Sequence, residues 1–163
     1  MSVAISFLNK DQKELWLPRM FDLMYENMQT IVPDEIPHAQ QKAQFLAEVS
    51  PALEKAPRQV ILCICDETLV GFLQYYTRGD LLVIEEIQLL KKFQGSLTFY
   101  HLCKYLAASL PKNIAFLEAY THKGNTFSQK LLQKLDLELL EDSQNSPFFH
   151  FHGSIQKAKS YFQ

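Results

Sequence analysis

Cysteine and net charge are scarce in this sequence, and each of these shortages excludes a class of protein. The 163 residues include 5 glycines and 3 cysteines, and an odd number of cysteines on apolar segments does not fit a disulfide framework. With 16 basic residues against 18 acidic ones, the formal net charge is −2, which provides no basic stripe for nucleic acid. No apolar run reaches the ~18 residues of a membrane span, and the first residues do not resemble a secretory signal.

The remaining composition is typical of one globular domain. Apolar residues make up 47% of the chain and charged residues 21%, which is ordinary for a water-soluble fold. A chain of this length can bury a sizeable core as a single domain. We therefore expect one domain over residues 1–163 in the reducing cytoplasm, with neither nucleic acid nor a membrane as a partner.

Hydrophobic periodicity predicts a chain that mixes helices and strands. The predicted strands are at 3–8, 59–66, 69–77, 81–90, 114–121, 137–141 and 148–154, and the predicted helices at 12–30, 39–49, 97–110 and 125–135. Pro51 is expected to bend the second helix. Short turns predict an antiparallel meander, while a helical crossover makes neighbouring strands parallel. The order β-α-α-β-β-β-α-β-α-β-β therefore predicts an α/β (α+β) fold, with a mixed, mostly antiparallel sheet of six to seven strands and helices on both faces.

The stretch KKFQGSLTFYHL, residues 91–102, passes from a strand into a helix through Gln94 and Gly95. The first N–H groups of a helix have no intrahelical partners, and the helix dipole makes them a binding site for anions. A pyrophosphate could therefore lie across the amides of residues 95–99. Phosphate-binding loops normally hold several glycines, and this one holds Gly95 alone, so an ordinary strand-to-helix turn is the alternative.

The element order, with this turn after the fourth strand, resembles the GCN5-related N-acetyltransferase (GNAT) family over nearly the whole chain. The loop motif of that family is Gln/Arg-x-x-Gly-x-Gly/Ala. A motif that begins at Gln94 places Leu97 and Phe99 at the glycine positions, and one that begins at Lys92 keeps Gly95 but ends at Leu97.

A second segment, NTFSQKLLQKLDL at 125–137, is similar to the family pattern Asn-x-x-Ala-x-x-Leu-Tyr-x-Lys-Leu-Gly-Phe. The matching residues are Asn125, Leu131, Lys134 and Leu135. Leu132 replaces a tyrosine that in many members protonates the departing thiolate, and leucine has no proton to donate.

The resemblance implies acetyl-CoA or another acyl-CoA as co-substrate, no metal, and an amine on a small molecule or peptide as acceptor. It also implies that the fourth and fifth strands part near their C-terminal ends, often with a bulge in the fourth. Carried over residue by residue, the cofactor-binding set is Leu89, Gln94, Gly95, Ser96, Leu97, Thr98, Phe99 and Asn125. The backbone N–H of Leu89 would polarise the thioester carbonyl.

In this family a carboxylate on the fourth strand often serves as general base. The strand VIEEIQLL offers Glu85 and Glu86, which strand alternation would point to opposite faces of the sheet. Glu85 lies four residues before Leu89, and hence on its face, so Glu85 is the first candidate for the base and Glu86 the second. The alternative is that one glutamate is solvated and the other pairs with a lysine.

Other interpretations stay open at this point. The missing glycines and tyrosine would also fit a non-catalytic relative that serves as a binding or regulatory domain, or a homodimer formed through the last strands. His150 and His152 alternate along a strand, so they share a face and could border the amine pocket. A zinc site with Cys63 and Cys65 is conceivable, although these cysteines are better interpreted as small apolar core residues.

Overall fold

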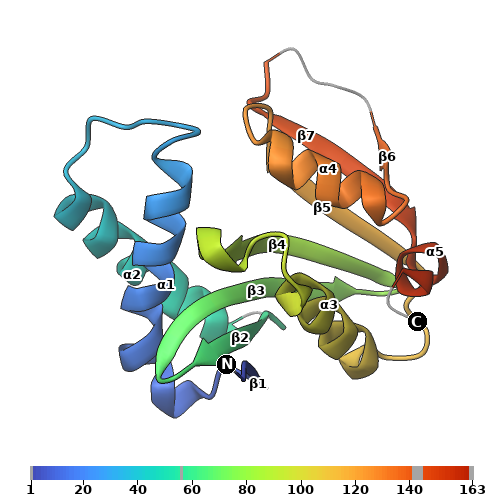
Figure 1. Ribbon diagram of the computed structural model, residues 1–163, viewed down its shortest axis with the longest axis horizontal. Helices are drawn as coiled ribbons and strands as arrows, with labels where there is room; N and C mark the ends of the chain where they lie inside the picture. Colours follow the sequence, from blue (N-terminus) through green and yellow to red (C-terminus); the bar gives the residue numbers. More distant parts are fainter. Residues whose placement is uncertain (1, 56, 141–144, 162–163) are drawn as a thin grey trace.

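A mixed β-sheet forms the centre of the computed structural model, which describes residues 2–55, 57–140 and 145–161 (Figure 1). The described strands are β1 (Ala4–Phe7), β2 (Gln59–Cys65), β3 (Thr68–Arg78), β4 (Leu81–Leu89), β5 (Phe116–His122), β6 (Glu138–Leu139) and β7 (Phe148–Ser154). They form one seven-stranded sheet in the order β1-β2-β3-β4-β5-β7-β6. Neighbouring strands are antiparallel except β4 and β5, which are parallel as predicted.

Five α-helices cover the two faces of this sheet within the described residues. They are α1 (Lys13–Met28), α2 (His38–Lys55), α3 (Leu97–Ser109), α4 (Thr126–Lys134) and α5 (Ile155–Ser160), with short 3-10 helices η1 (Lys10–Gln12) and η2 (Lys91–Phe93). The predicted fold class and element order are therefore confirmed. None of the described helices is long and apolar enough to cross a membrane.

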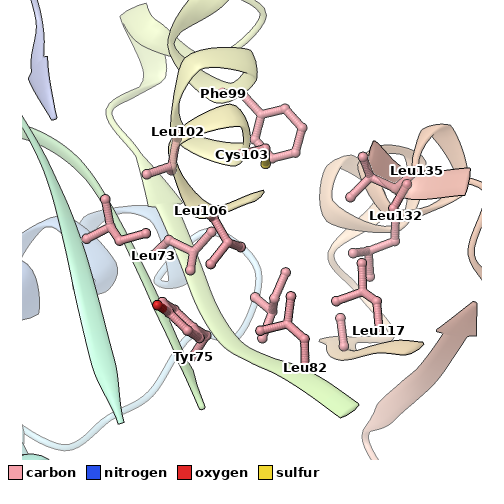
Figure 2. Close-up of a cluster of buried hydrophobic side chains, with 14 of the residues drawn as sticks. Leu73, Tyr75, Leu82, Phe99, Leu102, Cys103, Leu106, Leu117, Leu132 and Leu135 are labelled. Atoms are coloured by element: carbon pink, nitrogen blue, oxygen red, sulfur yellow. The ribbon is translucent and has the colours of Figure 1, made fainter. Parts of the chain in front are cut away.

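A separate hydrophobic core lies on each face, because successive strand residues point to opposite sides. The larger core packs α3, α4 and α5 against the sheet, and Figure 2 shows its buried side chains, among them Leu73, Leu82, Phe99, Leu102, Leu106, Leu117 and Leu135. The smaller core packs α1 and α2 against the other face through Trp16, Leu17, Met20, Leu23, Leu53 and Phe72. The strands β2 and β3 contribute side chains to both cores, whereas the buried β4 side chains Leu82, Ile84 and Leu89 belong to the larger one.

The helix predicted over 39–49 is longer in the structure. It begins at His38 and continues through Pro51 to Lys55, although proline removes one backbone hydrogen bond from a helix interior. Leu53, which is 8% exposed, packs into the smaller core. This burial keeps the last turn helical. The strand predicted over 137–141 is shortened to β6, and residue 141 lies outside the described residues.

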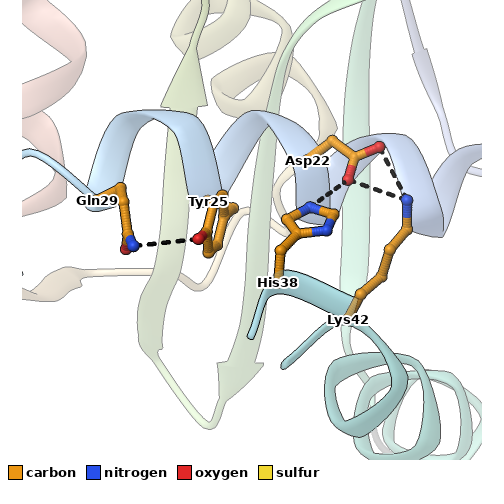
Figure 3. A network of polar contacts seen from close by, with 5 residues as sticks. All are labelled: Asp22, Tyr25, Gln29, His38 and Lys42. Carbon is orange, nitrogen blue, oxygen red and sulfur yellow. Dashed lines mark hydrogen bonds and ion pairs between the residues drawn. The ribbon is translucent and has the colours of Figure 1, made fainter. Parts of the chain in front are cut away.

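A polar network fixes the start of α2 to the middle of α1 (Figure 3). Asp22 accepts hydrogen bonds from Lys42 at 2.9 Å and lies 3.1 Å from Nε2 of His38. The imidazole of His38 packs edge-on against Tyr25, whose hydroxyl accepts a hydrogen bond from Gln29. Although each exposed contact contributes little to stability, together they orient the C-terminal half of α1, which forms one wall of the cleft described below.

The strands β4 and β5 pair at their beginnings and then part. Their register runs from Leu81 opposite Phe116 to Ile84 opposite Ala119, while the strands continue to Leu89 and His122 with no further pairs among the described residues. Figure 1 shows the two strands diverging into a V. The register of β3 with β4 also shifts between Gln74 and Tyr75, which leaves Glu85 as an extra residue in a β-bulge. The predicted parting of the strands, and the bulge in β4, are confirmed.

Candidate active-site cleft

The parting of β4 from β5 opens a cleft that α1 and α4 close on two sides. It consists of two adjoining hollows with volumes of about 140 and 130 Å³. Both hollows are lined by Met28, Ile87, Gln88, Asn125, Ser128 and Leu132. The cleft therefore joins residues as far apart in the sequence as Met28 and Leu132.

The backbone of β4 presents hydrogen-bonding groups to this cleft. Leu90 donates its N–H to the carbonyl of Val70 at 2.9 Å, and hydrogen-bonded pairs alternate along an antiparallel ladder. The peptide groups of Ile87 and Leu89 therefore point away from β3, toward the side from which β5 has departed. The carbonyl of Leu89 on this edge accepts hydrogen bonds from the side chains of Asn27 and Gln94, and the N–H of Leu89 points to the same side.

Glu85 and Glu86 lie on the same face of the sheet, which corrects the expectation from simple alternation. Gln74 is opposite Glu86 in the ladder, yet its side-chain amide donates to Glu85 at 2.8 Å. The bulge is the physical reason, since an extra residue turns two successive side chains to one side. Ile87 and Leu89 contribute to the larger core, on the α3 face, so Glu85 does not share a face with Leu89.

The two glutamates differ sharply in their surroundings. Both carboxylate oxygens of Glu85 accept hydrogen bonds from Nε of Arg58 at 2.9 Å, in addition to the bond from Gln74. Glu86 has no such cation beside it among the described residues. Burial raises the pKa of Glu86 to about 7, a hydrogen bond from Gln88 lowers it, and the charge of Glu85 raises it. A carboxyl group with a pKa near neutrality can both accept and release a proton under cellular conditions.

The start of α3 resembles an anion-binding turn whose donors are partly engaged. Gly95 has a φ of +76°, a conformation that glycine adopts without strain. Ser96 is the N-cap, and its hydroxyl accepts the N–H of Thr98 at 3.2 Å. Leu97 is 70% exposed, whereas Phe99 is 6% exposed and packs in the larger core. The side chain of Leu97 therefore leaves the amides of this turn uncovered.

The structure brings some predicted cofactor residues together and separates others. Leu89, Gln94, Phe99 and Asn125 line the same hollow. Ser96, Leu97 and Thr98 line a different groove, between α3 and β1, and Gly95 lines neither. The turn at the start of α3 therefore faces a groove outside the cleft.

Asn125 and Leu132 lie on α4 at the wall of the cleft. The side-chain oxygen of Asn125 accepts the N–H of Ser128 at 3.0 Å and caps the helix. Leu132 is 4% exposed and packs in the larger core. A tyrosine at position 132 would reach the same cleft, so the position matches the family's acid even though the residue does not.

Three polar residues of the cleft were not predicted from the sequence. The hydroxyl of Thr121, which is 4% exposed, has no hydrogen-bond partner among the residues that the structure describes. It lines the hollow that also contains both glutamates. Asn27 and Gln88 are buried and bonded to each other at 2.9 Å. Their signal in the sequence was slight: a polar residue on the apolar stripe of a helix, and a polar residue two positions after Glu86.

The histidines and cysteines do not form a metal centre. No three His, Cys, Asp or Glu side chains in the described ranges lie together in a way that could hold a metal ion. His150 stacks on Tyr120 at 4.3 Å and lies 3.3 Å from Glu118, and His152 stacks on Phe116. Cys63 and Cys65 are buried in the larger core, and burial raises the pKa of the Cys63 thiol to about 12.

The insertion of β7 between β5 and β6, the bulge in β4 and the parted strands define this as the fold of the GNAT acetyltransferases. Solved structures of that class superpose on nearly the whole chain. No protein-family model matches the sequence, and neither does any curated protein. The resemblance predicted from the sequence is thus confirmed at the level of the fold.

Three solved structures illustrate this similarity. A PaiA N-acetyltransferase from Thermoplasma acidophilum, in complex with coenzyme A, has a TM-score of 0.74 at 15% identity over 94% of this chain and 99% of its own. A GNAT-family acetyltransferase from Staphylococcus aureus Mu50 has a TM-score of 0.72 at 11% identity, with 94% and 99% covered. The Campylobacter jejuni N-acetyltransferase PseH, in complex with acetyl coenzyme A, has a TM-score of 0.59 at 16% identity, again with 94% and 99% covered.

Proposed function

We propose that this protein is a divergent GNAT enzyme that transfers an acetyl or related acyl group from acyl-CoA to a primary amine on a small molecule or peptide. The observation that carries the proposal is the parting of β4 from β5, which opens a cleft with a near-neutral carboxyl group, Glu86, on its wall. Two of the similar structures hold coenzyme A or acetyl-CoA.

The residues of the cleft fit an acyl-CoA. The exposed edge of β4 at Ile87 and Leu89 can pair with the amides of a pantetheine chain, as a further strand would. Thr121 carries a buried hydroxyl that has no partner in the described part of the chain, which is costly unless a ligand supplies one. The amides of residues 95–99, at the start of α3, would hold the pyrophosphate, and Leu89 N–H would polarise the thioester carbonyl.

Glu86 is our candidate for the general base. An alkyl amine has a pKa near 10.4 and is mostly protonated at neutral pH. Glu86 accepts its proton, directly or through water, so that the nitrogen lone pair attacks the thioester carbon. The C–S bond then breaks and the thiolate of CoA leaves. Since free thiols have a pKa of about 8.5, the thiolate departs without an acid at position 132.

Glu85 is less suited to this role. Both of its oxygens are engaged by Arg58 and one also by Gln74, so a substrate amine would have to displace a charge-assisted hydrogen bond. We propose instead that Glu85 holds the bulge in place.

The experiment that tests the proposal combines binding with turnover. Acetyl-CoA at a hundred times its dissociation constant should stabilise the folded protein by about 2.7 kcal/mol, which a thermal shift detects. Release of the CoA thiol is then followed across a panel of primary amines. A thermal shift with no turnover on any amine would favour the non-catalytic relative, which the leucine at position 132 supports. Absence of both would refute acyl-CoA binding.

Two further parts of the proposal concern the oligomeric state and the cellular location. A homodimer through the last strands is supported by Leu139, which is 47% exposed on β6, the strand at the edge of the sheet. Light scattering at two protein concentrations tests it. We also propose that the enzyme acts in the cytoplasm, where acyl-CoA is available and buried thiols such as Cys63 stay reduced.

A further inference from the structure

A buried chain of side-chain amides connects α1 to Glu86. Asn27, which is 9% exposed, donates one N–H to Oε1 of Gln88 and the other to the carbonyl of Leu89, both at 2.9 Å. Gln88, which is 6% exposed, donates from Nε2 to Oε1 of Glu86. The three side chains form one directional chain that begins on the helix and ends at the cleft.

The direction of this chain is fixed by Asn27. Its amide nitrogen faces two oxygen atoms, those of Gln88 and Leu89, and an amide nitrogen donates but does not accept. Gln88 must therefore turn its oxygen toward Asn27, which leaves its N–H groups to face Glu86. With Asn27 absent, the amide of Gln88 could rotate by half a turn and present its oxygen to the carboxylate.

We propose that Asn27 and Gln88 are positioning residues, which hold the carboxylate of Glu86 by one oxygen and direct the other to the incoming amine. The proposal rests on the proposed role of Glu86 as the base. Glu86 is the group that would touch the substrate, and Asn27 and Gln88 act through it. Because Met28 follows Asn27 and lines both hollows, the chain also ties Glu86 to the wall against which the acceptor lies.

The charged and titratable groups around Glu86 come from several elements. Glu85 precedes it on β4 and is paired with Arg58, next to β2. Tyr120 and His122 line the same hollow from β5, while α1 contributes the uncharged Met28. Of the named influences on the pKa of Glu86, burial and Glu85 raise it and the Gln88 hydrogen bond lowers it. Loss of that bond therefore raises the pKa further.

The test measures the titration of Glu86 in the protein without substrate, so that it does not depend on turnover. The glutamate carboxyl carbons are followed by NMR from pH 4 to pH 9, roughly the range over which a raised carboxyl titrates, and Glu86→Gln assigns the signal. Gln88→Leu should raise the pKa by about one unit, because a hydrogen bond to a charged group is lost. Asn27→Asp should raise it further for two reasons: a carboxylate cannot donate and makes Gln88 turn its oxygen to Glu86, and it adds a negative charge near Glu86.

Gln74→Leu is the matched control. It is also a glutamine on a sheet strand that donates to a glutamate, but the acceptor is Glu85, so the pKa of Glu86 should stay where it is. If Gln88→Leu and Gln74→Leu move the pKa of Glu86 equally, or if Asn27→Asp leaves it unchanged, the positioning role is refuted. Should Gln88→Leu not fold, Gln88→Met, which has nearly the same length, carries the same test.

Turnover then separates this proposal from the proposed function. In an active enzyme, the ascending limb of the pH–rate profile should move in Gln88→Leu by the amount that NMR records. A shift of the pKa without any turnover on amines supports the positioning pair and refutes the enzyme. If the pKa of Glu86 shifts but the ascending limb of the pH–rate profile does not move, a catalytic role for Asn27 and Gln88 is refuted.

Discussion

Gln74 lies directly opposite Glu86 in the β3–β4 ladder, yet its amide donates to Glu85. The bulge brings the two carboxylates to one face and then assigns them different surroundings. Glu85 is neutralised by Arg58, whereas Glu86 faces the cleft with a carboxyl pKa of about 7. Two adjacent glutamates thus have different surroundings, and mutating each in turn can distinguish their roles.

The first prediction compares these glutamates. Glu86→Gln should lower the turnover number by a factor of ~10²–10⁴, the usual loss on removal of a general base, with the affinity for acetyl-CoA nearly unchanged. Glu85→Gln should lower the turnover number less than Glu86→Gln does, since the proposed role of Glu85 is to hold the bulge in place. Steady-state kinetics on a proven amine measure both. The reverse ranking would restore Glu85, the first candidate from the sequence, as the base.

The sequence predicted the elements well because their apolar patterns are strong. Phe99, Leu102 and Leu106 recur at helical spacing on α3, and this apolar stripe is buried. The prediction failed for the faces of Glu85 and Glu86, because a bulge shifts the alternation of side chains along the strand and leaves no local signal in the sequence. It also missed the contact of Asn27 with Gln88, which are 61 residues apart, since pairings at such a separation depend on how α1 packs on the sheet. Leu97, outside the stripe, points to solvent rather than inward.

The second prediction concerns stability and pH. The folded pKa of Glu86 is raised from 4.5 to about 7, so the folded state binds a proton that the unfolded state releases at lower pH. The free energy of unfolding therefore falls as the pH rises from ~4.5 to ~7, by at most about 3 kcal/mol. Chemical denaturation at pH 5 and pH 8 should show a smaller fall for Glu86→Gln. An identical fall in wild type and variant contradicts the raised pKa.

The third prediction uses two glycines with the same backbone conformation. Gly79 and Gly95 have φ of +61° and +76°, and neither would bring an added Cβ within 4 Å of another atom. Each change to alanine should cost about 1 kcal/mol of stability from backbone strain. Gly95→Ala should also weaken acetyl-CoA binding, measured by calorimetry, because it alters the turn before α3. Gly79→Ala, in the turn between β3 and β4, serves as the control, and equal affinities in the two variants would place the pyrophosphate elsewhere.

The last prediction concerns Leu132→Tyr, which introduces the proton donor that this chain lacks. Leu132 is 4% exposed and lines both hollows, so the larger ring should cost about 1–3 kcal/mol through overpacking. Its hydroxyl would reach the cleft, where the departing thiolate forms. Because a thiolate leaves readily near neutral pH, the added acid should change the turnover number less than Glu86→Gln does, or raise it. Leu132→Phe, with the same ring and no hydroxyl, isolates the contribution of the proton. A large gain in Leu132→Tyr over Leu132→Phe would mean that thiolate departure limits the rate, while equal rates would mean that another step does.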